Sequence, residues 1–427
     1  MIFSKNVFCV VDGYSTGKHV VYALKAYGFD CIHVQSSEYL PEIDIANFKP
    51  DDYLKCIVWQ GEPDFLSQIE GYNIKAVFPG CESGVIVADD IINLLGLATA
   101  NDPMLSQARR NKYHMVEALK AHRVNTVEHI KADSFEKIQS WIHDNNIEYP
   151  LVCKPLESAG TFGVSICKTE AELKSSVCGL LNAVDISSGL VMNEVLVETF
   201  SVGQEYSVNT VSYDGKHHVS EIMCANKTII ERVPIYDYSE MLSPVKDKVI
   251  FNKLSQYVST VLDALGIRYG AAHTEVIYNS EKDSVIMIEC GARLNGGIDL
   301  SAYTSALGYS QLSLLMGSYL NPEAFLQYQK LCTQELQNHM MVVFLISDGD
   351  YTIRNEAGWN QLFDDMKTLH AITVNSNTFC KTKDIFNAPG FLTLIGKDRA
   401  ALKRDYEYFR SIESKLYQSL SEEKAIA

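Results

Sequence analysis

The sequence has few of the features that mark nucleic-acid-binding or membrane proteins. Its 427 residues carry a formal net charge of −16 and no long cluster of Lys and Arg. Nucleic acids and anionic membranes both require a basic surface to neutralise their phosphates, so neither is expected as a partner. No apolar run approaches the roughly twenty residues of a transmembrane helix. The short apolar run near the N-terminus meets Asp12 too early for a signal peptide. We therefore expect a cytoplasmic protein.

Zinc-finger spacing and disulfide frameworks are also missing. The eleven cysteines form no CxxC pair and have no histidines at zinc spacing. Cys9, Cys56, Cys153 and Cys290 lie inside apolar runs, which predicts buried, reduced thiols. With no internal repeat and no low-complexity tract, the chain is expected to be an ordinary globular protein, long enough for roughly two to four domains.

The N-terminal part alternates between short apolar runs and helical stretches. Runs at 7–11, 31–34, 56–59 and 76–79 are predicted to be buried strands. Buried apolar strands separated by helices are typical of a parallel, doubly wound sheet.

After Asp102-Pro103 the alternation becomes less regular, and a further α/β segment begins after about residue 330. The predicted elements are a polar helix over 106–121, two strands joined by a glycine-containing loop over 149–167, strands near 190–211 and 271–289, a helix over 249–265, strands at 342–346 and 391–395, and a charged C-terminal helix.

Two glutamates stand where an antiparallel hairpin would bring them together. Apolar strands around Glu275 and Glu289 are separated by the polar segment 279–284, a natural turn. In a hairpin turned about Lys282 the two side chains lie opposite each other, roughly 5 Å apart, where like charges repel. A divalent cation removes that repulsion, and converging carboxylates with room for phosphate oxygens suit Mg²⁺. The alternative is a pair of solvated glutamates on an exposed sheet face.

Two glycine-containing loops could bind a ligand. The turn at 290–297 holds Arg293 and Asn295, which could offer a guanidinium fork and an amide. Upstream, Lys154 ends an apolar strand, where burial is costly without an anionic partner. The small residues at 158–163 could let backbone N–H groups approach phosphates. Alternatively, the first loop is a structural turn and the second a hairpin loop beside a lysine that reaches solvent.

Taken in order along the chain, these segments resemble the ATP-grasp superfamily over roughly residues 75–300. Within it, Phe-Pro-Gly-Cys-Glu-Ser-Gly at 78–84 and Arg-Arg-Asn-Lys-Tyr at 109–113 are most similar to motifs of the L-amino acid ligases, which make dipeptides through an acyl phosphate. The resemblance implies an α/β (α+β) ATP-grasp fold with an N-terminal Rossmann-like parallel-sheet domain. The implied divisions are an N-terminal α/β domain (1–103), a small lid subdomain with the phosphate loop (104–200), a large subdomain with the metal site (201–330) and a C-terminal α/β lobe (331–427).

The resemblance also implies roles for individual residues. Glu275 and Glu289 match the magnesium ligands of the family, a site that Mn²⁺ could also occupy. Arg293 matches the arginine that steadies the reacting phosphoryl and acyl groups, and Glu205 would accept hydrogen bonds from the ribose hydroxyls. The residues matched to the ATP site are Lys112, Lys154, Ser158, Gly160, Thr161, Gly163, Glu198, Thr199, Ser201, Glu205 and Lys227.

The substrate side has three candidate contacts. Glu82 follows Pro-Gly at the end of a strand, where it could meet a substrate amine or cap the following helix. His273 shares a strand face with Glu275, so it could reach a substrate carboxylate or phosphate, or simply pack. Gly296 of the Gly-rich turn is the third. On the nucleotide side, Lys227 lies in a segment that resembles a loop near the triphosphate, although a surface lysine is the alternative.

One position departs from the family pattern. Gly291 stands where many relatives have Asn, two residues after the second metal glutamate. A water or Asn295 would have to supply the missing ligand, or the second ion would be held loosely. The departure also leaves open a degenerate, inactive member of the family.

The sequence thus predicts an ATP-dependent, ADP-forming ligase that couples an amino-acid carboxylate to an amine. Small-molecule carboxylate and amine substrates are the expected partners, and related ligases are compatible with a homodimer. Two alternatives stay open: another ATP-grasp chemistry, such as a nucleotide-pathway amine ligase or a biotin-carboxylase-like enzyme, and a non-catalytic ATP-binding sensor. A bicarbonate requirement would mark the carboxylase, and ATP binding without amino-acid-dependent phosphate release would mark the sensor.

Two further motifs do not fit this chemistry. Segment 12–19 is similar to a phosphate-binding loop, but its glycines are one residue too close and His19 stands where Ser or Thr should hold Mg²⁺. A strand-to-helix turn is expected there instead. His217 and His218 follow Asp-Gly at 214–215, which predicts a hairpin tip without a third metal ligand.

Overall fold

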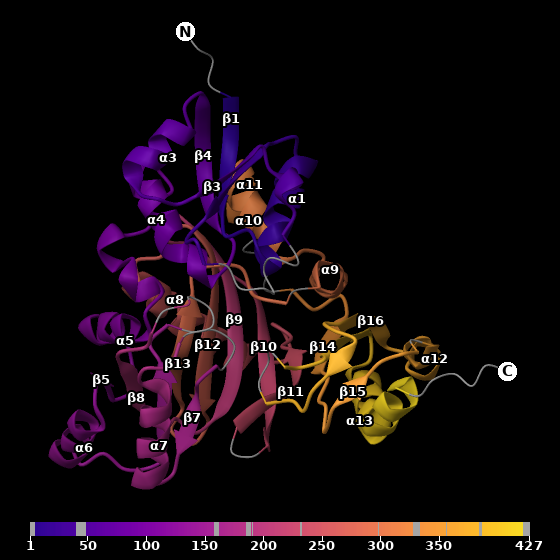
Figure 1. Cartoon of the computed structure of the whole chain (residues 1–427). Helices are drawn as coiled ribbons and strands as arrows, with labels where there is room; N and C mark the ends of the chain where they lie inside the picture. The colour runs from indigo at the N-terminus through magenta and orange to yellow at the C-terminus, as the bar shows by residue number, and fades with distance from the viewer. Residues whose placement is uncertain are drawn as a thin grey trace.

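A computed structural model of the chain describes residues 5–39, 48–157, 162–184, 189, 191–230, 233–297, 299–327, 334–355, 357–383 and 387–421. These residues form a four-stranded N-terminal sheet, a second four-stranded sheet, a central eight-stranded sheet and a two-stranded ribbon. In Figure 1 the N-terminal sheet lies above the central sheet, and the C-terminal helices lie to one side. None of the described helices is both long and apolar enough to cross a lipid bilayer.

The N-terminal sheet is parallel, as the alternation of strands and helices predicts. Its order is β3-β2-β1-β4, and every neighbouring pair is parallel. Strands β1 and β4 contribute side chains to hydrophobic clusters on both faces, which explains their continuous apolar runs. The elements are β1 (Lys5–Val11), α1 (Lys18–Ala26), β2 (Cys31–Gln35), β3 (Lys55–Val58), α3 (Glu62–Gln68), β4 (Tyr72–Pro79) and α4 (Val85–Leu94).

The segment at 12–17 is the predicted strand-to-helix turn. It leads from β1 through one 3₁₀ turn into α1. The buried Asp12 carboxylate accepts hydrogen bonds from the hydroxyls of Ser36 and Ser83 at 2.6 and 2.5 Å. This carboxylate therefore ties three loops together at the carboxyl edge of the sheet.

The second sheet, β5-β8-β6-β7, is antiparallel throughout. Helices α6 and α7 share a hydrophobic cluster with it. The helix expected from residue 106 begins only at Lys112, because the Asn111 side chain caps its first turn and 3₁₀ turns occupy most of 103–109. The elements are α5 (Lys112–Ala121), β5 (His129–Ala132), α6 (Phe135–Asp144), β6 (Leu151–Pro155), β7 (Ser165–Cys167), α7 (Glu170–Leu180) and β8 (Val195–Thr199).

The eight-stranded sheet has the order β13-β12-β9-β10-β11-β14-β18-β16. Helix α8 covers one face and packs with it into a large hydrophobic cluster. The predicted turn at 214–215 joins β9 to β10 with positive φ at both residues, but the long β10–β11 hairpin has no clear apolar alternation and was not predicted. The elements of this part are β9 (Gln204–Tyr213), β10 (Lys216–Ile230), β11 (Val233–Met241), α8 (Lys248–Ala264), β12 (Gly270–Asn279) and β13 (Ser284–Gly291).

Strands from the C-terminal part extend this same sheet, since β14 pairs with β11 and is followed by β18 and β16. Helix α13 is joined to β11 by Arg410, which donates to Asp237 Oδ1 at 2.9 Å and to the Phe344 carbonyl at 2.7 Å. The elements are α9 (Leu300–Leu307), α10 (Gln311–Leu320), α11 (Pro322–Gln327), β14 (His339–Phe344), β15 (Tyr351–Thr352), α12 (Ala357–Asp365), β16 (Leu369–Val374), β17 (Thr378–Phe379), β18 (Gly390–Gly396) and α13 (Arg399–Ser421).

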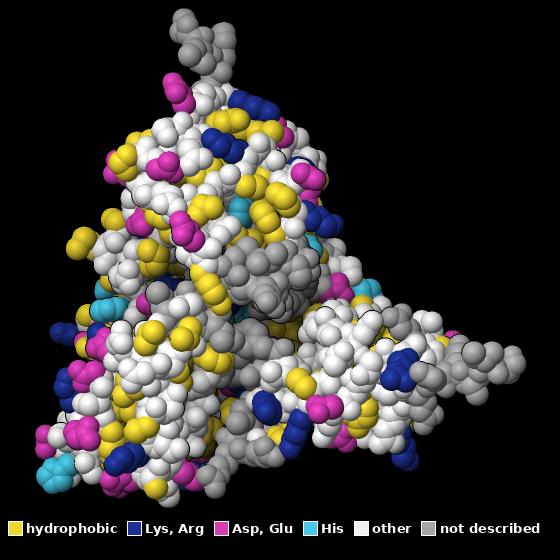
Figure 2. Space-filling model, in the orientation of Figure 1, with side chains coloured by type: hydrophobic (Ala, Val, Ile, Leu, Met, Phe, Trp, Pro, Cys, Tyr) yellow, Lys and Arg dark blue, Asp and Glu magenta, His cyan; other side chains and the backbone are white. Residues whose placement is uncertain are grey.

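Two surface features bear on the predictions. Cys9, Cys153 and Cys290 are buried, but Cys56 is exposed, because β3 is an edge strand and turns this side chain to solvent. None of the ten described cysteines forms a disulfide. On the face drawn in Figure 2, acidic and basic side chains are interspersed, and Lys and Arg form no continuous area there.

Candidate active site

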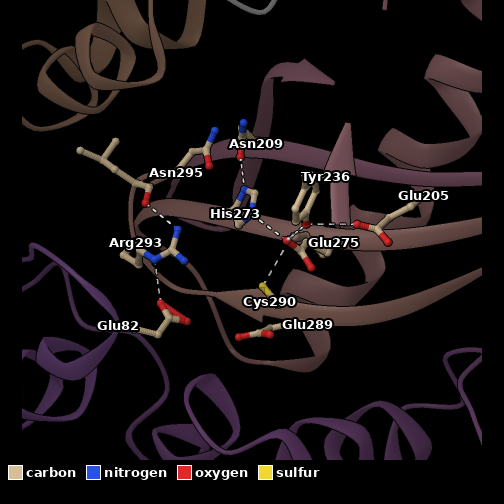
Figure 3. Close-up of polar contacts among 12 residues, drawn as sticks. Glu82, Glu205, Asn209, Tyr236, His273, Glu275, Glu289, Cys290, Arg293 and Asn295 are labelled. Atoms are coloured by element: carbon tan, nitrogen blue, oxygen red, sulfur yellow. Dashed lines mark hydrogen bonds and ion pairs between the residues drawn. The ribbon is translucent and has the colours of Figure 1, made fainter. Parts of the chain in front are cut away.

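The predicted pairing of the two glutamates is confirmed. Glu275 of β12 lies directly opposite Glu289 of β13 (Figure 3). Val276 and Cys290, which follow them, point into the cluster under α8, so the two carboxylates face away from that helix. We call the sheet face that carries them the site face.

A β-bulge, which the sequence did not predict, allows the two glutamates to pair while Val276 and Met287 remain buried in the core. Nearer the turn Val276 pairs with Met287, and the register then shifts so that Glu275 pairs with Glu289 and Ile288 is extra. Without the bulge Glu275 would oppose Ile288, and Glu289 would follow Met287 into the core.

Positive charges, one buried and one half-buried, lie beside the carboxylates of the site. Lys112, at the start of α5, places its Nζ 3.2 Å from Glu289 Oε1. Arg293, in the turn after β13, donates from Nε to Glu82 Oε2 at 2.7 Å. Burial alone would raise the pKa of Glu82, but the charges of Arg293, Arg110 and Lys112 lower it. The Glu82 carboxylate is therefore ionised and bound to Arg293, and it does not cap the following helix.

His273 faces the site beside Glu275, as their shared strand face predicts. Its Nε2 lies 3.5 Å from Glu275 Oε1, and its Nδ1 lies 2.7 Å from Oδ1 of Asn209 on β9. Burial alone would raise the pKa of Glu275, but the hydrogen bond and charge of His273 lower it, with smaller contributions from Lys227 and Arg293. The sequence pattern did not single out Asn209, whose contact depends on strand pairing.

The lysines expected at the nucleotide are balanced by carboxylates. Lys154 Nζ lies 2.7 Å from Glu198 Oε2, with both side chains buried, and Lys227 Nζ lies 2.7 Å from Glu205 Oε1. The predicted loop around Lys227 is wrong, because this residue lies within β10 and pairs with Tyr236 of β11.

Tyr236 is a site residue that sequence reasoning missed. Its hydroxyl lies 3.3 Å from both Glu205 Oε1 and Glu275 Oε1, and Lys227 Nζ lies 4.2 Å from the centre of its ring. Burial and the two carboxylates raise the pKa of Tyr236 well above its usual value, so the phenol remains a hydrogen-bond donor. A tyrosine in a predicted strand would have been the signal, but β11 itself was not predicted.

Of the other predicted site residues, some are among the described residues and some are not. Thr199 ends β8, Ser201 follows it, and both are half-buried. Gly163 adopts a φ of +71°, and Gly296 lies in the turn after β13 with open space where a side chain would begin. Three predicted phosphate-loop residues lie outside the described residues: Ser158, Gly160 and Thr161.

The metal prediction rests on two ligands from the protein. No group of three or more His, Cys, Asp or Glu side chains in the described part of the chain is arranged to hold an ion. Glu275 and Glu289 alone suit a hard cation that takes its other ligands from phosphate oxygens and water, as Mg²⁺ does in phosphoryl-transfer sites.

The glycine that departs from the family pattern has a structural reason. A Cβ added to Gly291 would lie 2.7 and 2.8 Å from the two carboxylate oxygens of Glu82. That carboxylate therefore occupies the space that any side chain at position 291 would need. The Glu82–Arg293 ion pair in its present position therefore requires a glycine at position 291.

Gly291→Ala is expected to push Glu82 away from Arg293. We expect the free energy of unfolding to fall by about 1–3 kcal/mol and amino-acid-dependent phosphate release to fall with it. Thermal or urea unfolding and a phosphate assay measure the two effects. Gly179→Ala in α7 is the matched control, since nothing lies within 4 Å of the added Cβ. Wild-type behaviour of Gly291→Ala would contradict the packing described here.

Comparisons with known proteins agree with this geometry. Residues 147–301 match the ATP-grasp domain family. Over 429 aligned residues the chain is 31% identical to dapdiamide A synthase from Enterobacter agglomerans, and the alignment covers 97% of each protein.

Solved structures show the same architecture. An L-amino acid ligase from Bacillus licheniformis superposes with a TM-score of 0.72 at 16% identity, covering 96% of this chain and 97% of that one. An N5-carboxyaminoimidazole synthase from Aspergillus clavatus superposes with a TM-score of 0.67 at 13% identity, covering 96% and 99%. At these identities the two structures support the fold alone.

Proposed function

Since the chain belongs to the ATP-grasp family of carboxylate–amine ligases, we propose that it couples the carboxylate of an amino acid to the amine of a second substrate, with ADP and phosphate as products. The observation that carries the proposal is the opposed pair Glu275–Glu289 on the site face, beside Lys112 and the Arg293–Glu82 pair. The names of the similar proteins, a dapdiamide synthase and an L-amino acid ligase, favour amino acids as substrates.

We assign the nucleotide to the part of the molecule that holds Lys154 and Glu205. Lys112 and Lys154 would contact the phosphates, and Glu205 the ribose hydroxyls. Glu198, Thr199 and Ser201 would border the adenine, Lys227 would lie near the phosphates, and Gly163 together with Ser158, Gly160 and Thr161 would form the loop over the triphosphate. Lys154 and Lys227 are paired with Glu198 and Glu205, so carboxylates hold both lysines in the positions from which they would contact ATP.

The chemistry proceeds in two transfers. A carboxylate oxygen of the first substrate attacks the γ-phosphorus of ATP, the bond to the ADP oxygen breaks, and an acyl phosphate forms. The amine nitrogen then attacks the acyl carbon, phosphate leaves, and the nitrogen loses a proton. Mg²⁺ or Mn²⁺ held by Glu275 and Glu289 would neutralise phosphate charge during this reaction. Arg293 would stabilise the oxyanion of the second transfer.

We assign substrate contacts to residues around Arg293. Glu82 is ionised and next to Arg293, so it can attract a substrate ammonium group. His273 is on the same face as Glu275 and can reach a carboxylate or phosphoryl oxygen. Gly296, where an added Cβ would have no atom within 4 Å, would border the substrate.

Phosphate release by the purified protein with MgATP and pools of L-amino acids tests the proposal. Release that requires amino acids, followed by identification of an amide product, would establish the ligase. Release that requires bicarbonate instead would indicate the carboxylase chemistry of ATP-grasp relatives. ATP binding without release in any pool would indicate a sensor and contradict the proposal.

Tyr236→Phe is expected to lower the stability of the protein without weakening its binding of MgATP. The hydroxyl lies 3.3 Å from a carboxylate oxygen of both Glu205 and Glu275. In the proposed complex these carboxylates bind ribose and metal, so the hydroxyl is not needed for nucleotide binding. We expect the free energy of unfolding to fall by about 1 kcal/mol, measured by urea titration. A several-fold rise in the Kd for MgATP would show that the hydroxyl contacts the bound nucleotide.

A further inference from the structure

A row of polar side chains crosses the site face at one level of the sheet. His273 of β12 is directly opposite Asn209 of β9, and Asn209 is directly opposite Glu221 of β10. Directly opposed residues in antiparallel strands point to the same face. Neither Asn209 nor Glu221 belongs to the site assigned above.

Each member of the row is hydrogen-bonded to the next. Asn209 Nδ2 donates to Glu221 Oε1 at 2.6 Å, and Asn209 Oδ1 lies 2.7 Å from His273 Nδ1. Figure 3 shows Asn209 aimed at the His273 ring from the strand above it. Asn209 is fully buried and Glu221 is 2% exposed, so water does not compete for these contacts.

Glu221 determines which way the Asn209 amide faces. An amide nitrogen can only donate and an amide oxygen can only accept. Because Oε1 of Glu221 takes the nitrogen, the oxygen must face His273, and Nδ1 of that ring must carry the proton. Burial raises the pKa of Glu221 to about 7. A proton on its other oxygen, Oε2, leaves Oε1 an acceptor, and Oε2 has no hydrogen-bond partner among the described residues.

We propose that Glu221 and Asn209 are positioning residues that hold His273 with a proton on Nδ1 and direct its Nε2 toward Glu275 and the reacting groups. The Nε2–Glu275 distance of 3.5 Å shows that the remaining nitrogen faces the site. If the amide of Asn209 turned over, its N–H₂ would face Nδ1 and the proton would move to Nε2. A ring protonated at both nitrogens, the form whose hydrogen bond and charge stabilise the ionised Glu275, would then be disfavoured.

Three substitutions separate positioning from packing. Glu221→Met keeps the volume and removes the acceptor that orients the amide. Glu221→Gln keeps an acceptor oxygen for Asn209 and should rescue the arrangement. Asn209→Leu removes the partner of His273 altogether. Thermal unfolding and MgATP affinity report whether each variant is folded with an intact nucleotide site.

Nitrogen NMR of ¹⁵N-histidine-labelled protein reads the outcome directly, with the His273 signals assigned from His273→Ala. Wild type and Glu221→Gln are expected to show a protonated Nδ1. Glu221→Met and Asn209→Leu are expected to lose that signature, with kcat for phosphate release lowered about 10- to 100-fold and MgATP affinity unchanged. An unchanged His273 spectrum in folded Glu221→Met would overturn the proposal. Equal loss of kcat in Glu221→Gln and Glu221→Met would also overturn it.

The effect on turnover rests on the proposed function, but the spectrum does not. If the wild-type protein releases no amino-acid-dependent phosphate, the proposed function fails, while the His273 signals still decide whether Glu221 and Asn209 orient the ring. If activity is present but the His273 signals do not respond to either substitution, only the positioning role fails.

Discussion

Glu289→Gln is expected to reduce amino-acid-dependent phosphate release by at least about a hundredfold, because losing a direct metal ligand should exceed the 10- to 100-fold effect typical of outer-shell changes. The substitution preserves shape and removes one of two opposed carboxylates. Glu275 would then hold the cation alone, and Lys112, 3.2 Å from the lost charge, would lose its ion pair with Glu289. The buried lysine would repel the cation that the site has to bind.

Initial rates over a series of Mg²⁺ and Mn²⁺ concentrations measure this effect. A higher metal requirement together with the lost rate would identify Glu289 as a ligand. Glu281→Gln, the same charge change at an exposed position in the turn of the same hairpin, should leave rate and metal dependence unchanged. Full activity and an unaltered metal dependence in Glu289→Gln would rule out the proposed metal site.

Arg293→Lys should lower kcat by about 10²- to 10³-fold, the cost of losing one group that stabilises a developing oxyanion. Arg293 donates from Nε to Glu82 and from Nη1 to the Leu294 carbonyl at 2.8 Å. Among the described residues Nη2 makes no hydrogen bond. Lysine keeps the charge but cannot reach Glu82 and a reacting oxygen at the same time.

Steady-state kinetics with MgATP and the identified amino acids would separate the steps. We expect kcat to fall much more than the affinity for MgATP, because we assign the Arg293 guanidinium to the reacting substrate and not to the nucleotide. Arg268→Lys provides a control at an exposed arginine. A fall confined to MgATP affinity would place Arg293 in the nucleotide site instead.

The sequence alone was sufficient to place several local features. The apolar runs of the N-terminal part each became a strand of a parallel sheet, because burial on both faces requires continuous apolar side chains. A polar turn between two strands predicted the opposed pair Glu275–Glu289, although the observed register reaches that pairing through the bulge at Ile288. The order of motifs along the chain was enough to indicate the ATP-grasp family.

Other site features depended on contacts that are distant in sequence. Glu82 and Arg293 are 211 residues apart, and no local pattern relates them or explains Gly291 between them. Tyr236 was missed because β11 shows no regular alternation, although pairing with β10 and β14 holds it as a strand.

Periodicity and spacing determined which residues form strands, which side chains share a face, and the chemistry that those side chains can perform, because these properties depend on neighbours along the chain. Only the tertiary structure decided the bulge at Ile288, the burial of Glu82 against Gly291, and the row from His273 to Glu221. Each of these depends on register between strands or on packing between separate segments. The hydrogen-bond partners that orient a buried side chain come from those distant neighbours, and a single strand's sequence carries no information about them.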